Sequence, residues 1–195
     1  MHRLEDKTEK LLASMFFAKP VTLNTTQQKR ITRWMLKTAM AFEFLGGQDT
    51  GRHPVYFLQS ERQSLLRPSV ILPDTRCFLA RFKDPNAADI IPKETHGPHV
   101  SLNLDGNRYE MQGYSFTLTI KHLTLQVFVI RRPEHLVGER ILIEIPNWSA
   151  ATVTLWPPDE TTKTVNWPPG NLVLDNVGLD IFADRWSDAT IKSNV

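Results

Sequence analysis

Apolar positions in the first part of the chain recur at the spacing of a helix. Within residues 2–16 they fall on one helical face, at Leu4, Leu11, Leu12, Met15 and Phe16, and charged residues occupy other positions of the segment. Pro20 interrupts this pattern. The spacing therefore predicts a helix near residues 3–16.

A second helix is predicted over residues 26–45. Thr25 and Gln28 have the spacing of a capping box, in which two side chains satisfy the free backbone donors at a helix start, and Gly46-Gly47 supplies a stop. An apolar arc follows the segment through Ile31, Trp34, Met35, Thr38, Phe42 and Leu45. In the second half, further apolar residues extend this arc almost all round the helix, namely Ala39, Met40, Ala41 and Phe44. We therefore expect the second half to be buried.

A short third helix is predicted from Ser60 to Arg67. Ser60 and Gln63 repeat the spacing of a capping box. Pro68 ends the run, because the residue before a proline disfavours helical backbone.

From about residue 75 the hydrophobic period changes from 3.6 to 2, which is the period of strands. The segments that read as strands are Arg76–Lys83, His99–Leu104, Tyr114–Lys121, Leu123–Arg131, Ile141–Ile145 and Thr152–Trp156. The connections, such as Asp105-Gly106, are short enough for antiparallel neighbours. The segment from Leu172 to Trp186 is expected to form one last short strand or helix, and the final residues are expected to be frayed.

The order of helices first and strands afterwards is typical of one fold class. We predict an α+β fold, with N-terminal helices packed on a mostly antiparallel meander sheet. With 195 residues, of which 41% are hydrophobic and 23% charged, the chain has the size and composition of an ordinary globular domain. We expect a single domain over residues 1–195, helical over 1–70 and β-rich over 75–186.

Cysteine content and charge restrict the class of protein further. Cys77 is the single cysteine and lies in an apolar run, so we interpret it as a small core residue, and no disulfide can form within one chain. The charged N-terminus lacks a signal-peptide core, and no stretch reaches the roughly 18 apolar residues of a membrane span. We expect a cytoplasmic protein with no membrane association. The formal net charge of +2 is too small to indicate nucleic-acid binding by itself.

The histidines do not have the pattern of a catalytic or metal site. His96 and His99 lie close together, but Gly97-Pro98 between them prevents the helix on which a histidine pair shares a metal. His99, Asn107 and His122 follow the letter order of an HNH nuclease, yet His122 lies between two predicted strands, where that site needs a helix. Neither a nucleophile elbow nor a glycine-rich phosphate loop is present in the sequence. We predict no catalytic residue, no metal site and no cofactor.

Two Trp-Pro-Pro segments lie eleven residues apart, at Trp156-Pro157-Pro158 and Trp167-Pro168-Pro169. Proline fixes the backbone and cannot donate to a strand ladder, so each segment is a rigid non-strand piece beside a large aromatic residue. Proline recognition and ligand stacking are conceivable roles. We expect instead that the tryptophans cap the core where a loop crosses the sheet.

A basic stripe at the start of the second helix is the candidate binding site. It consists of Lys29, Arg30, Arg33 and Lys37, of which the last three project on one side of the helix beside the apolar arc. Cations near a helix N-terminus oppose the helix dipole by about 0.3–1 kcal/mol each, so helix stability does not explain them. They could bind phosphate groups. They could also form a solvated face or pair with acids from elsewhere in the fold.

Several segments of the chain together resemble a bacterial family of HNH-endonuclease-like proteins, found in bacteria and mobile elements. They are Met1–Thr8, Leu23–Gln28, Trp34–Met40 and the two Trp-Pro-Pro segments. In that family a zinc-binding Cys-x-x-Cys-Asn segment, a Trp-Met pair and a Leu-Glu helix precede a helical stretch and a long β-rich region. The resemblance implies that Met1 and Leu4-Glu5 correspond to that Met and Leu-Glu. The metal-binding and catalytic segment lies before residue 1 in the family, so no catalytic residue is carried over, and we expect a truncated descendant, a fragment or a start at an internal Met.

Two functions from different classes are compatible with this sequence. The first is a non-catalytic, nucleic-acid-associated accessory domain derived from an HNH-endonuclease-like protein, which would use the basic stripe as its contact. The second is a protein-binding inhibitor or adaptor from a phage or mobile element, such as an anti-CRISPR or other anti-defence protein, acting by occlusion. The partner is accordingly expected to be nucleic acid or a nucleic-acid-processing protein complex. Salt separates the two, because phosphate binding weakens steeply with ionic strength while an apolar interface does not.

Overall fold

The computed structural model describes residues 2–50, 56–67, 70–83, 90–104, 107–132, 141–144, 152–170, 173–185 and 190–193. The helices are α1 (His2–Phe16), α2 (Thr25–Thr50), α3 (Gln59–Ser64) and α4 (Asn176–Asp184). The strands are β1 (Val21–Asn24), β2 (Thr75–Arg81), β3 (Ile91–Leu104), β4 (Asn107–Ile120), β5 (Leu123–Arg131), β6 (Ile141–Glu144), β7 (Thr152–Trp156), β8 (Thr164–Trp167) and β9 (Thr190–Ser193).

The main sheet has five strands in the order β3-β4-β5-β2-β7, and each neighbouring pair is antiparallel. This confirms the α+β fold, with helices ahead of a mostly antiparallel sheet. β3, β4 and β5 form a meander, whereas β2 comes earlier in the chain and lies between β5 and β7. β1 pairs with β8 and β6 with β9 in two smaller sheets.

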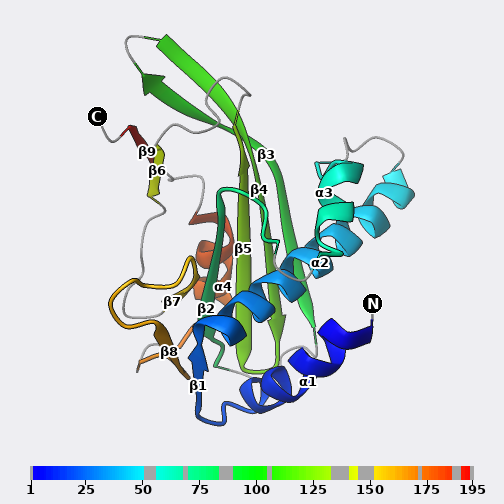
Figure 1. The fold of residues 1–195 in the computed structure, drawn as a ribbon, viewed down its shortest axis with the longest axis vertical. Helices are drawn as coiled ribbons and strands as arrows, with labels where there is room; N and C mark the ends of the chain where they lie inside the picture. Colours follow the sequence, from blue (N-terminus) through cyan, green and yellow to red (C-terminus); the bar gives the residue numbers. More distant parts are fainter. Residues whose placement is uncertain are drawn as a thin grey trace.

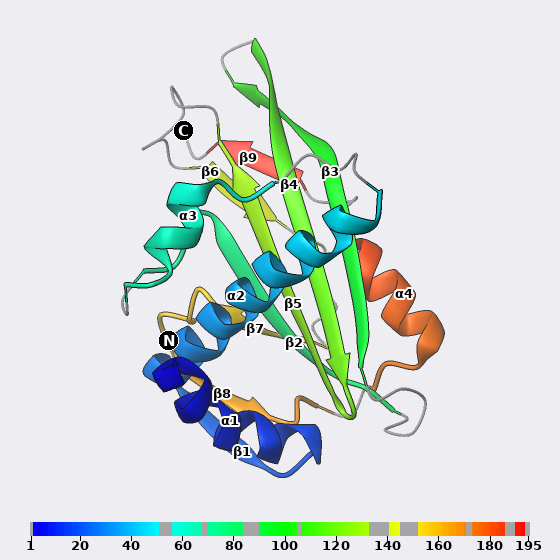
Figure 2. The same cartoon turned by 90° about the vertical axis from the view of Figure 1, so that its right-hand side faces the viewer.

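Helices cover both faces of the main sheet, as Figure 1 and Figure 2 show. Alternate residues of β2 point to two different clusters: Cys77 and Leu79 join the core beneath α1 and α2, while Phe78, Ala80 and Phe82 pack with α4. The sheet therefore has an α2 face and an α4 face. The larger core lies on the α2 face and includes residues from both the helical and the β-rich parts of the chain.

The start of α2 is capped one residue earlier than the sequence predicted. The Asn24 N–H donates to Gln27 Oε1 at 2.9 Å, and the Gln27 N–H donates to Asn24 Oδ1 at 3.0 Å. The predicted pair is used differently, because the Thr25 hydroxyl and the Gln28 amide both donate to the carbonyl of Lys163, at 3.2 and 3.0 Å. The prediction of a Thr25–Gln28 capping box was wrong because this contact between distant segments does not show in local spacing.

The second half of α2 also departs from the prediction. The helix continues through Gly46-Gly47 to Thr50, since glycine lowers helix propensity by about 1 kcal/mol without removing a backbone donor. Ala41 is exposed, while Glu43 is buried. The helix is therefore not buried all round, and one of its buried positions is a carboxylate.

Other elements were predicted with wrong boundaries. α3 begins after Leu58, whose N–H donates to Glu61 Oε2 at 2.7 Å, so the predicted Ser60–Gln63 box does not start it. β3 begins at Ile91 rather than at His99, because a shift in register between His96 and His99 takes up the intervening residues.

The sequence also missed some short elements. β1 and β8 were not predicted, and β9 occupies residues that were expected to be frayed. The segment for which strand and helix were both left open contains α4, which is capped by Asp175, where Oδ1 accepts the Gly178 N–H at 2.8 Å.

Candidate functional site

The predicted basic stripe is divided between surface and core. Lys29, Arg30 and Lys37 are half-buried, and the Lys29 ammonium lies 5.9 Å from the centre of the Trp156 ring. Arg33, in contrast, is only 8% exposed. The expectation that Arg33 projects from an exposed stripe was therefore wrong.

Arg33 fastens the chain that follows α3 to the side of α2. Its guanidinium donates to three backbone carbonyls, those of Leu65 at 2.7 Å, Arg67 at 2.8 Å and Val70 at 3.1 Å. Burial lowers the pKa of Arg33, but the carbonyl oxygens supply partial negative charge to the side chain. The pattern missed this role because the acceptors are backbone atoms more than thirty residues away.

The first turns of α2 are held in place at a second point. Gln28 Nε2 donates to the carbonyls of Leu23 at 2.9 Å and Lys163 at 3.0 Å, which ties the helix start to β1 and to the turn before β8. Lys163 thus lies beside the start of α2. The same turn carries the exposed acids Asp159 and Glu160. Hydrogen bonds from Thr161 and Thr162 lower the pKa of Asp159, so this carboxylate is ionised at neutral pH.

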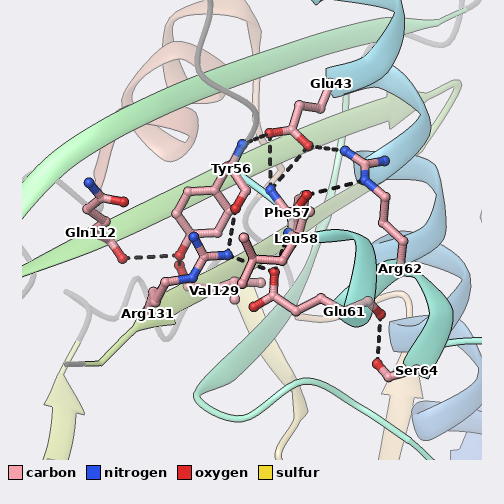
Figure 3. Close-up of polar contacts among 10 residues, drawn as sticks. All are labelled: Glu43, Tyr56, Phe57, Leu58, Glu61, Arg62, Ser64, Gln112, Val129 and Arg131. Atoms are coloured by element: carbon pink, nitrogen blue, oxygen red, sulfur yellow. Dashed lines mark hydrogen bonds and ion pairs between the residues drawn. The ribbon is translucent and has the colours of Figure 1, made fainter. Parts of the chain in front are cut away.

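A buried ion pair lies farther along α2, and the sequence gave no prediction of it (Figure 3). The side chain of Glu43 is 3% exposed and contacts the guanidinium of Arg62 on α3. Its oxygens also accept the backbone N–H groups of Tyr56 and Phe57. Arg62 donates in addition to the carbonyl of Met40, at 2.7 Å. The carboxylate is thus satisfied on several sides, which is the usual condition for burying a charge.

A second ion pair extends this cluster to the sheet. Arg131, at the end of β5, donates to Glu61 Oε2 at 2.7 Å and to the carbonyl of Tyr56. The Arg131 guanidinium also lies 4.7 Å from the centre of the Tyr56 ring. The Tyr56 hydroxyl donates to the carbonyls of Gln112 at 3.1 Å and Val129 at 3.0 Å. Burial raises the pKa of Tyr56 well above its usual value.

This cluster, formed by Glu43, Tyr56, Glu61, Arg62 and Arg131, is suited to holding structure together. Each carboxylate has a guanidinium partner, and the Tyr56 hydroxyl is committed to backbone carbonyls. One signal could have indicated it: Glu43 is the first acid of α2 and stands among apolar residues. A charge at such a position needs a partner if it is buried.

Two other candidate residues of the sequence, His122 and Cys77, are surrounded by parts of the fold. His122 lies in the turn between β4 and β5, with Nδ1 2.9 Å from the carbonyl oxygen of Phe82. Cys77 is fully buried, and burial raises the pKa of its thiol to about 12. The side chains of His96, His99 and Asn107 lie outside the described part.

Among the residues that the structure describes, no group of three or more His, Cys, Asp or Glu side chains is arranged to hold a metal ion. No helix there is both long and apolar enough to cross a membrane.

The two tryptophans of the Trp-Pro-Pro segments pack against the main core. Trp167 belongs to the core, and Trp156 is half-buried beside it, paired in register with Cys77. The expected packing against the core is therefore observed, but both tryptophans end strands, β7 and β8, rather than lying in a loop that crosses the sheet.

A comparison with protein-family models, curated proteins and solved structures finds no match. The resemblance to HNH-endonuclease-like proteins therefore stays a prediction.

Proposed function

We propose that this chain is a non-catalytic, nucleic-acid-associated accessory domain that contacts phosphate groups through Lys29, Arg30 and Lys37. One observation carries the proposal. The first five turns of α2, from Thr25 to Phe42, contain four cations and no acid. The origin from an HNH-endonuclease-like protein and the cytoplasmic location are part of this proposal.

The anchoring of α2 supports a binding role for these cations. Arg33 joins the helix to the chain after α3, and Gln28 joins its start to Lys163. A helix that is held at two points has a fixed backbone. The cations near these two points project from that fixed backbone. Less conformational entropy is then lost when a partner binds.

The surroundings of the reactive groups support a role other than catalysis. The Cys77 thiol is buried with a raised pKa, Glu43 and Glu61 are paired with arginines, and His122 is placed against a backbone carbonyl. A catalytic nucleophile or base needs access to a substrate and a pKa suited to proton transfer. These described groups are instead engaged with the fold.

Reversing the three half-buried cations tests the proposal. In the Lys29→Glu/Arg30→Glu/Lys37→Glu variant, we expect binding to a short DNA duplex or single strand to weaken at least tenfold. The slope of log affinity against log salt should fall by about 2–3, because about three fewer counterions are released. Fluorescence anisotropy at several salt concentrations measures both quantities, after circular dichroism has shown that the variant folds.

A matched control reverses the exposed cations Lys10 and Lys19, which lie outside α2. The Lys10→Glu/Lys19→Glu variant changes the net charge by four units, against six for the α2 variant, and should keep most of the affinity. If the α2 variant folds and binds DNA with unchanged affinity and salt slope, or if the wild type binds no nucleic acid, the proposal is wrong.

A protein-binding inhibitor or adaptor from a phage or mobile element, such as an anti-CRISPR protein, is the second candidate. It is favoured by two exposed leucines that flank α3, Leu58 with 53% and Leu66 with 70% of its surface accessible. An exposed apolar patch can mark a protein interface. A complex that weakens in Leu58→Asp/Leu66→Asp, and depends little on salt, would support this candidate over the first.

A further inference from the structure

Arg185, which directly follows α4, has a buried side chain on the α4 face of the sheet. It is 3% exposed, and its guanidinium carbon lies 4.3 Å from the centre of the Phe78 ring and 4.2 Å from that of Phe182. Both distances are within the range of cation–π contacts. The position after the last turn of α4 also places the cation at the negative end of the helix dipole.

One edge of this guanidinium is held by Gln126 on β5. Arg185 Nε donates to Gln126 Oε1 at 2.9 Å. Gln126 Nε2 donates to the carbonyls of Phe182 at 3.0 Å and Ala183 at 3.2 Å, and to the hydroxyl of Thr117 at 3.1 Å. These bonds fix the amide with its oxygen toward Arg185, so the guanidinium has a fixed orientation.

The opposite edge of the guanidinium has no acceptor among the described residues. Nη1 and Nη2 are both buried, and neither has a hydrogen-bond partner there. Together they carry four N–H donors. Burial lowers the pKa of Arg185 to about 10, which leaves the side chain protonated at neutral pH. A buried cation with unused donors is costly, so an acceptor is expected at this edge.

Several other arginines have acceptors of the kind that the Nη atoms of Arg185 lack. Arg62, Arg131 and Arg132 each contact a carboxylate, and Arg33 donates to three carbonyls. Of the arginines that the structure describes, Arg185 is the one with both Nη atoms buried and without a partner.

We propose that the Nη edge of Arg185 binds one small oxoanion, through a pair of anionic oxygens supplied by a carboxylate or a phosphate group. The planar fork of two parallel N–H donors matches such a pair of oxygens. Gln126 and the two phenylalanine rings hold the fork in place before the anion arrives. The site lies on the α4 face, and the proposal is independent of nucleic-acid binding at α2.

Thermal unfolding of the whole chain with different anions tests this site. Protein in a chloride buffer is incubated with inorganic phosphate or with succinate, at constant ionic strength. Long incubation is needed because an anion reaches a buried edge only through local opening of the structure. We expect one of the two anions to raise Tm in a saturable way, by about 5–10 °C at a concentration 100 times its Kd. The anion that acts identifies the class, and no rise above the chloride control with either would overturn the proposal.

Two variants show whether the effect arises at Arg185. Arg185→Met removes the charge at similar size, and we expect it to lose the response while its Tm in chloride equals or exceeds that of the wild type. Arg33→Met is the control, because it removes a buried arginine from the α2 face and should keep the response. An unchanged response in Arg185→Met would place the anion elsewhere and overturn the proposal.

A measurement on the wild type keeps the proposal testable if Arg185→Met does not fold. In protein labelled with ¹⁵N-arginine, the active anion should shift one arginine Nε–H signal by slow exchange. If no arginine signal changes at saturating anion, the proposal is wrong.

Discussion

The two faces of the main sheet bury their arginines in different ways. On the α2 face, Arg62 and Arg131 contact carboxylates, and Arg33 donates to three backbone carbonyls. On the α4 face, Arg185 has a glutamine oxygen and two aromatic rings, and its Nη atoms have no described partner. The acceptors on the first face belong to the described chain, so the charges there are part of the fold. On the second face two buried donor atoms have no described partner, and this is the basis of the anion site proposed there.

The backbone groups that contact Glu43 and Arg33 of α2 lie in one stretch of the chain. Glu43 accepts the N–H groups of Tyr56 and Phe57, and Arg33 donates to carbonyls between Leu65 and Val70. The described residues from 56 to 67, which contain the short helix α3, and residue 70 are thus fastened by side chains of α2. Buried charges there take the place of a larger apolar contact.

The largest effect on stability is expected from Glu43→Ala. This change leaves the Arg62 guanidinium and two backbone N–H groups without their acceptor, and breaking a buried ion pair in this way costs about 3–5 kcal/mol. Urea unfolding measures the difference in free energy. The exposed Glu9 of α1 gives the control, since Glu9→Ala should change stability by less than about 0.5 kcal/mol. A loss below about 1 kcal/mol for Glu43→Ala would show that the α2 face does not depend on its ion pairs.

The sequence predicted the elements whose patterns are long and regular. The helix near residues 3–16 and the strands over residues 123–131 and 152–156 match α1, β5 and β7 closely. The apolar positions of these patterns that the structure describes include buried core residues in each element, such as Met15, Val127 and Leu155. Local pattern and tertiary packing agree there, so the pattern is sufficient.

The contacts that distinguish the two faces could not be predicted in this way. Whether Arg33 points to solvent or to the carbonyl of Leu65 depends on where the chain after α3 lies, which no local spacing encodes. The same holds for Glu43 and Arg62, nineteen residues apart, and for Gln126 and Arg185, which are fifty-nine apart. Charged residues were read as surface residues because most are exposed.

A smaller effect, seen as a pH dependence, would sharpen the contrast between paired and unpaired groups on the α2 face. Burial raises the pKa of the Cys77 thiol from 9.0 to about 12, against the smaller opposing effect of hydrogen bonds with Thr32 and the backbone of Phe78. Above pH 9 the unfolded chain loses this proton while the folded chain keeps it, so stability falls as pH rises. Between pH 8 and pH 10 the wild type should lose about 1–2 kcal/mol more than Cys77→Ala. Urea unfolding of both proteins at the two pH values measures this difference.

Ionisation of Tyr56 contributes little to the stability difference measured between pH 8 and pH 10. The pKa of Tyr56 is also raised, but its unfolded-state ionisation begins near its ordinary value of 10.0 and is common to both proteins. Equal losses in the wild type and in Cys77→Ala would mean that the thiol titrates in the folded protein. Burying a charge on this face would then cost little free energy, and Glu43 would not need its partners for stability.

The smallest expected effect concerns the start of α2, where the observed cap and the predicted cap differ by one residue. Asn24 Oδ1 accepts the Gln27 N–H, so Asn24→Ala should cost about 1 kcal/mol, as for other helix N-caps. Thr25 donates from an exposed position to the carbonyl of Lys163, and Thr25→Ala should cost about half as much or less. Urea unfolding of the two single variants compares them directly, and both keep the charges of α2. A larger loss of stability in Thr25→Ala than in Asn24→Ala would support the cap that the sequence predicted. Removing a hydroxyl that caps a helix costs more stability than removing one that donates to a solvent-exposed carbonyl.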